Sequence, residues 1–94
     1  MRLEALQGAL ALALFAHASA GCSRPLPESD SPGATAYVRE CGVCHVAIHP
    51  GMMTAAMWDL QIKRMEEIRR RRGMPQITPH DLASIEAYLR AHAG

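Results

Sequence analysis

The stretch that decides the fold is Cys41-Gly42-Val43-Cys44-His45, near the middle of a 94-residue chain. It contains two of the three cysteines in the sequence, and a histidine directly follows the second of them. Two thiols three positions apart on a short turn can both form bonds to one edge of a planar ring system. The adjacent imidazole can then bind a metal at the centre of that ring system.

A C-x-x-C pair serves three kinds of chemistry, which the rest of the sequence distinguishes. A redox dithiol of the thioredoxin kind lies in a βαβ unit, and no segment of this chain alternates as a strand does. A structural zinc site needs four ligands, which leaves only an irregular set completed by His49 and His80. Covalent haem fits best: Cys41 and Cys44 form thioethers with the two vinyl groups, and His45 is the proximal iron ligand. We therefore predict one haem c.

The flanking sequence predicts three helices and no strands. The first covers residues 34–41 and places Tyr37, Val38 and Cys41 on adjoining parts of one face. The second begins after Thr54 as N-cap and ends in the basic run 69–72 with glycine after it. The third opens at Thr78-Pro79, with threonine as N-cap and proline at the first helical position. The prediction is an all-α fold.

Apolar stripes at helical spacing mark the sides of the second and third helices that form the core. They are Trp58, Ile62 and Met65 with Leu60 and Ile68 beside them, then Leu82, Ile85 and Leu89 with Tyr88 beside them. An ordered unit of about 60 residues has a marginal core, so we expect the haem to be part of it.

The N-terminal third predicts export. Arg2, the apolar run 8–16 and small residues at 18–20 are typical of a signal peptide, assigned to residues 1–21. Cys22 follows in a lipobox-like context, although Ser19 replaces the usual leucine. Lipidation of Cys22 would anchor the protein, and cleavage after Ala20 with a free thiol is the alternative. Residues 22–33 are expected to form a flexible Pro/Ser linker before a haem domain over residues 34–94.

The attachment motif and its flanks resemble the small monohaem bacterial cytochromes c of the class I kind. The resemblance covers residues 33–93: Gly33 and Tyr37 precede the motif, Pro50 follows it, Trp58 lies on a middle helix, and residues 78–89 form the closing helix. It implies a compact fold in which the first and last helices cross and a middle helix covers the haem. The chain is short between the motif and the last helix, which leaves the position of the distal ligand open.

Two methionines compete for that sixth iron position. Met74 is the first choice, because it lies in the loop between the second and third helices, where typical family members place the distal methionine. Met65 is the rival, because some short relatives carry a Trp-x6-Met helix like that from Trp58 to Met65, and its other role is core packing. A histidine or an open site is the remaining alternative.

Two further features allow functional interpretations. Trp58 is expected to pack against the porphyrin or to donate its indole N–H to a propionate. The arginines at 69–72 are expected to be a solvated helix end. In the alternative interpretation they neutralise propionates or steer an acidic redox partner.

The expected function is one-electron transfer in the periplasm, between redox proteins such as a dehydrogenase, an oxidase or another cytochrome. The alternatives are the haem subunit of a periplasmic dehydrogenase complex and a gas-binding or sensor haem with a vacant sixth site. A net charge of +1 gives no overall field that favours nucleic acid. The only membrane contact expected is the tether through Cys22.

Overall fold

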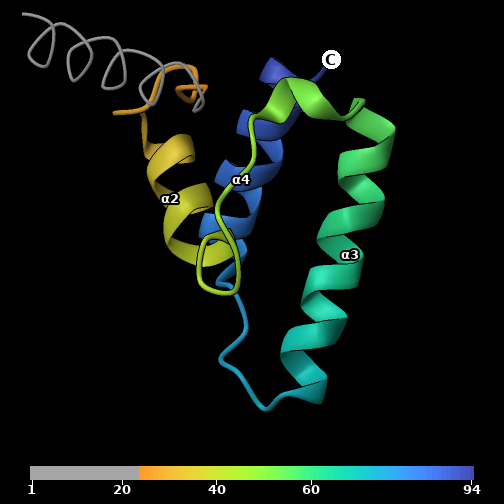
Figure 1. Cartoon of the computed structure of the whole chain (residues 1–94). Coiled ribbons are helices and arrows are strands. Elements are labelled where there is room, and N and C mark those ends of the chain that lie inside the picture. The colour runs from red at the N-terminus through yellow and green to blue at the C-terminus, as the bar shows by residue number, and fades with distance from the viewer. Residues whose placement is uncertain (1–23) are drawn as a thin grey trace, which may run out of the picture.

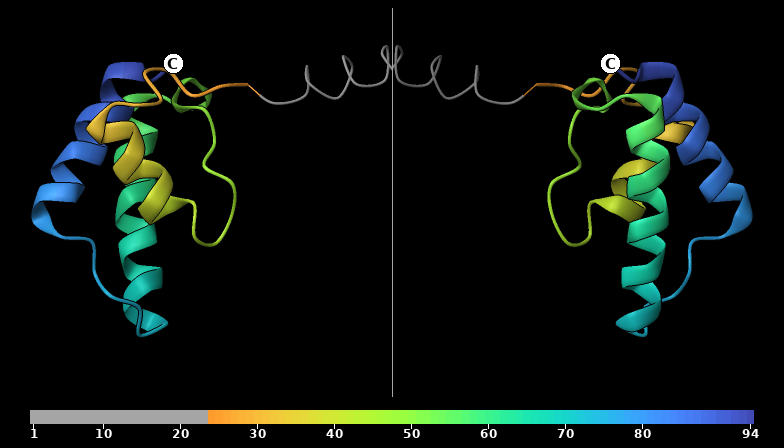
Figure 2. Two further views of the ribbon diagram at one scale, coloured as in Figure 1. Left: turned by 90° about the vertical axis from the view of Figure 1, so that its left-hand side faces the viewer. Right: turned by 90° about the vertical axis from the view of Figure 1, so that its right-hand side faces the viewer.

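The computed structural model describes residues 24–94, and these form a helical unit without strands. Its elements are α2 (Pro32–Cys41), the 3-10 turn η1 (Pro50–Met52), α3 (Ala55–Arg71) and α4 (Pro79–His92). Helix α4 packs against both α2 and α3 (Figures 1 and 2). The all-α, three-helix prediction is confirmed. The expected signal peptide and Cys22 lie outside the described residues.

Each helix begins at a side-chain cap. The hydroxyl of Thr54 accepts the N–H of Met57 at 3.2 Å, and that of Thr78 accepts the N–H of Asp81 at 3.2 Å. Both caps were expected. Helix α2 differs, because Ser31 caps it by accepting the N–H of Ala34 at 3.2 Å, and proline fills its first position. It therefore begins two residues before the expected start at residue 34.

The segment before α2 is fastened to α4. The Tyr88 hydroxyl donates to the carbonyl of Pro27 at 2.8 Å, His92 lies 3.1 Å from the Glu28 carboxylate, and Leu26 packs against the core. The described part of the expected linker over residues 22–33 thus contacts the folded unit from Leu26 onward. The prolines that suggested extended chain are compatible with these contacts and with a helix start.

The core lies where α2 and α4 cross. Its buried residues are Ala34, Ala36, Tyr37, Trp58, Ile85, Tyr88 and Leu89. Gly33 permits the close crossing, because a Cβ there would lie 2.7 Å from Cβ of Tyr88 and 3.1 Å from the carbonyl oxygen of Ser84. The rings of Tyr37 and Trp58 meet edge to face, with centroids 5.9 Å apart.

Helix α3 ends as the sequence predicts, with Gly73 in the left-handed region at φ 66°. The N–H of Gly73 donates to the carbonyl of Arg70 at 3.2 Å, and that of Met74 donates to the carbonyl of Arg69 at 2.9 Å. These are the two hydrogen bonds of a Schellman motif. The start of the loop that carries Met74 is therefore held by the helix end.

Two residues assigned to apolar faces point outward. Leu60 is 67% exposed, and Val38 is 48% exposed. Two positions along a helix rotate the side chain by about 200°, so Leu60 lies nearly opposite the buried Trp58. Within residues 24–94, no helix has the length and apolar character needed to cross a bilayer.

Candidate functional site

An apolar cavity of about 240 Å³ lies between the motif and the helices. Its walls are Tyr37, Cys41, His45, Ile48, Met53, Trp58, Gln61, Ile62, Met65, Ile77, Leu82, Ile85 and Leu89. A second cavity of about 170 Å³ adjoins it and is lined by Glu40, Cys41, Cys44, His45, Met65, Ile68, Arg69, Arg72, Met74 and Ile77. Cys41, His45, Met65 and Ile77 line both, so the motif stands at the junction of the two cavities.

The two motif cysteines lie at the wall of the second cavity as free thiols. Cys41 is the last residue of α2 and is half-buried, whereas Cys44 is exposed in the turn that follows. Burial raises the pKa of the Cys41 thiol from 9.0 to about 11, Glu40 adds to the shift, and Arg69 opposes it. Neither sulfur forms a disulfide, so both can form thioether bonds.

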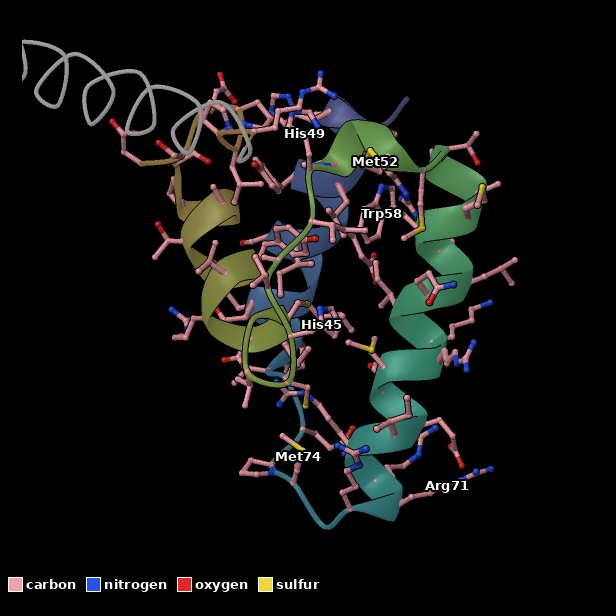
Figure 3. The ribbon with its side chains drawn as sticks, in the orientation of Figure 1. His45, His49, Met52, Trp58, Arg71 and Met74 are labelled. Atoms are coloured by element: carbon pink, nitrogen blue, oxygen red, sulfur yellow. The ribbon has the colours of Figure 1, made fainter. Side chains whose placement is uncertain are left out.

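One ring nitrogen of His45 is engaged, and the other has no hydrogen-bond partner among residues 24–94. Its Nδ1 lies 3.0 Å from the carbonyl oxygen of Val46, a contact that makes Nδ1–H the donor and leaves the lone pair on Nε2. This is the tautomer that a histidine needs in order to bind a metal through Nε2. Figure 3 shows His45 between the motif loop and α3. Two free thiols, an available Nε2 and adjoining apolar cavities fit a covalent haem.

The model of one protein family, described as dihaem cytochrome c, matches residues 37–94. The matched residues begin at Tyr37 and include the whole motif and every residue that lines either cavity. The chain belongs to this family. It is therefore a c-type cytochrome, a haem-based electron-transfer protein that binds haem c covalently. Comparison with curated proteins and with solved structures found no match.

The family description says dihaem, whereas these 94 residues contain one C-x-x-C-H motif. The only other cysteine is Cys22, which has no cysteine partner at the required spacing. The 94-residue sequence thus offers one set of residues for attachment of haem through a C-x-x-C-H motif.

The structure places the two methionine candidates differently. Met65, on α3, lines both cavities together with His45. Met74 lines only the second cavity, and Figure 3 shows it on the loop between α3 and α4. Among residues 24–94, His45 is the one histidine that lines a cavity. Nδ1 of His49 instead accepts the N–H of Gly51 at 2.9 Å, which caps η1.

The zinc alternative is not formed. Across residues 24–94, no three His, Cys, Asp or Glu side chains come together as metal ligands would. His80 is exposed on the first turn of α4, and His49 is occupied by its bond to Gly51.

Trp58 and Tyr37 brace the larger cavity. The indole N–H of Trp58 donates to the buried carbonyl of Pro50 at 2.7 Å, so the group that was a candidate propionate donor is engaged with the backbone. The Tyr37 hydroxyl donates to the carbonyl of Ile48 at 2.8 Å, and burial raises the pKa of Tyr37 well above 10. These two bonds attach the chain after the motif to α2 and α3.

The arginine run does not behave as one solvated helix end. Arg69 is buried, Arg70 and Arg71 pair with Glu67, and Nη1 of Arg72 lies 3.9 Å from the Cys44 sulfur. Sequence spacing could have identified Arg69, because it lies four residues after Met65 and so shares its helix face. The expectation of solvation was therefore wrong for Arg69.

Proposed function

We propose that this chain carries one haem c and transfers single electrons between redox proteins of the bacterial periplasm. The observation that carries the proposal is the free Nε2 of His45, beside two free thiols and at the junction of two adjoining cavities. When bound, the haem supplies an iron that alternates between ferric and ferrous states. Export through residues 1–21 and a lipid anchor at Cys22 remain part of the proposal on sequence grounds.

The protein's own residues hold and shield the group. Cys41 and Cys44 would hold the haem through thioethers, and His45 would bind its iron through Nε2. Trp58, Tyr37 and the apolar residues of α4 exclude water from the larger cavity. Because c-type attachment is covalent, a unit too small to enclose haem by contacts alone still retains it.

We further propose Met65 rather than Met74 as the distal ligand. Met65 shares both cavities with His45, whereas Met74 reaches only the smaller one. The backbone N–H of Met74 is also fixed by its bond to Arg69, which limits how far that residue can approach. A methionine ligand would make the iron six-coordinate and raise its reduction potential.

The haem count is tested by producing the chain in a host with the c-type maturation machinery and assaying haem per polypeptide. One haem per chain is expected, and none in Cys41→Ala/Cys44→Ala. Two haems per chain would contradict the proposal.

The ligand and the function are tested together by carbon monoxide and by the absorption band of methionine-ligated ferric haem. We expect slow, weak binding to the reduced wild type, loss of the band in Met65→Ala, and a wild-type spectrum in Met74→Ala. Loss of the band in Met74→Ala alone would reverse the ligand assignment. Fast carbon monoxide binding by the wild type would favour the gas-binding alternative over the electron carrier.

A further inference from the structure

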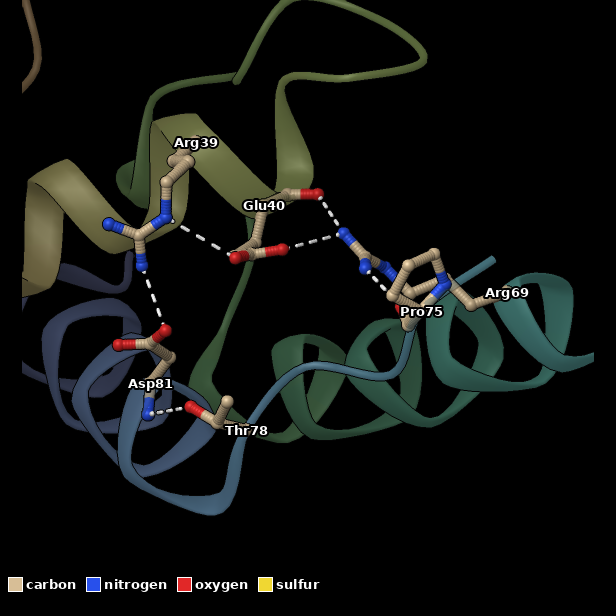
Figure 4. Close-up of polar contacts among 6 residues, drawn as sticks. All are labelled: Arg39, Glu40, Arg69, Pro75, Thr78 and Asp81. Carbon is tan, nitrogen blue, oxygen red and sulfur yellow. Dashed lines mark hydrogen bonds and ion pairs between the residues drawn. The ribbon is translucent and has the colours of Figure 1, made fainter. Parts of the chain in front are cut away.

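The most buried charge in the described residues belongs to Arg69 on α3. Its side chain is 10% exposed and makes three hydrogen bonds, all shown in Figure 4. Nη2 donates to the carbonyl of Glu40 at 2.6 Å and to Oε2 of Glu40 at 3.0 Å, and Nη1 donates to the carbonyl of Pro75 at 2.7 Å. One guanidinium thus joins the end of α2, the end of α3 and the loop before α4.

This ion pair lies in the wall of the proposed haem site. Glu40 and Arg69 both line the second cavity, which Cys41, Cys44 and His45 also line. Glu40 directly precedes Cys41 in the chain. The side chain of Glu40 is 22% exposed, so both charges are largely withdrawn from water.

The other charges around the pair are more exposed. Arg39 bonds Oε1 of Glu40 at 3.3 Å and Oδ2 of Asp81 at 2.9 Å, but its side chain is 52% exposed and it lines neither cavity. Arg72 lines the second cavity as an exposed residue. Solvent weakens the effect of exposed charges on a buried centre far more than that of buried ones.

We propose that the Glu40–Arg69 pair sets the reduction potential of the haem, with the two charges acting in opposite directions. This rests on the proposed function. Reduction adds one electron from the donor to ferric iron and gives ferrous iron, so the centre becomes less positive by one charge. The Arg69 cation favours the ferrous state and raises the potential, and the Glu40 carboxylate favours the ferric state and lowers it.

The test measures the midpoint potential of the haem-loaded protein. Glu40→Gln keeps the backbone carbonyl that Arg69 bonds and removes one negative charge, so the potential rises. Arg69→Met removes the cation and the potential falls. The double variant returns toward the wild-type value. Arg71→Met is the matched control: it removes the same charge from the same helix at a position 78% exposed, and its shift is the smallest.

A second pair of measurements separates charge from structure. Arg69→Lys keeps the charge but not the planar fork of donors, so its potential stays near the wild-type value while its unfolding midpoint falls. If Arg69→Met does not fold, Glu40→Gln and Arg69→Lys decide the question.

Two results overturn the pair's role while leaving the proposed function intact. The first is that the midpoint potentials of Glu40→Gln and Arg69→Met shift in the same direction. The second is that, in haem-loaded protein, neither potential shifts by more than that of Arg71→Met. A wild-type chain that takes up no haem overturns the proposed function, and with it the role of the pair.

Discussion

Replacing Trp58 with phenylalanine removes the bond that joins α3 to η1. The indole N–H and the Pro50 carbonyl meet at 2.7 Å in a buried position, so the substitution leaves a buried carbonyl without a donor. That loss costs about 1–3 kcal/mol. The smaller ring also leaves unfilled space beside Tyr37, which adds about 1 kcal/mol. The free energy of unfolding should fall by roughly 2–4 kcal/mol in total.

The assay is guanidinium unfolding of the haem-loaded protein followed by far-UV circular dichroism. With a slope of about 2 kcal/mol per molar, the midpoint should fall by roughly 1–2 M. Tyr37→Phe is the matched control, since it also loses one hydrogen bond to a backbone carbonyl but keeps its ring, and about 1 kcal/mol is expected. A Trp58→Phe midpoint within about 0.3 M of wild type would refute the reasoning.

Four other positions give expected outcomes of their own. Gly33→Ala should lower the free energy of unfolding obtained from a thermal melt by about 1–3 kcal/mol, because its Cβ would collide with Tyr88 where α2 and α4 cross. Gly73→Ala should cost only about 1 kcal/mol in the same melt, since φ is 66° but nothing lies within 4 Å of the new Cβ; equal losses at both glycines would contradict this. Glu67→Gln should change the free energy of unfolding measured in guanidinium by less than about 0.5 kcal/mol, because its partners Arg70 and Arg71 are exposed. Burial raises the pKa of Tyr37 above its usual 10.0, so the folded protein holds the phenol proton more tightly than the unfolded chain does. The resulting stabilisation is complete below about pH 10 and is lost as pH rises above it. Between about pH 9 and 11, the free energy of unfolding should therefore fall less steeply in Tyr37→Phe than in the wild type.

Short stretches of sequence were enough to predict the helix ends that depend on neighbouring residues. The caps at Thr54 and Thr78 and the glycine after α3 depend on a few neighbouring residues, and all three are where the sequence indicates. The start of α2 was missed because composition favoured a linker, although Ser31 followed by proline is itself a helix start.

Long-range contacts decided what the sequence left open. Helix spacing from Met65 places Arg69 on the cavity side of α3. Its ion-pair partner Glu40 lies 29 residues earlier, and nothing local in the sequence indicates that pairing. The choice between Met65 and Met74 likewise depends on which face of α3 meets the motif. The motif residues themselves needed no such information, because thioether and iron chemistry fix their order and spacing.

The fastening of the N-terminal segment has a mechanical consequence. Contacts of Pro27 and Glu28 with Tyr88 and His92 come before α2 in the chain. A pull on the N-terminus, as a membrane tether would transmit, therefore loads α4 first. Helix α2, whose last residue is Cys41, carries force only after those contacts have broken.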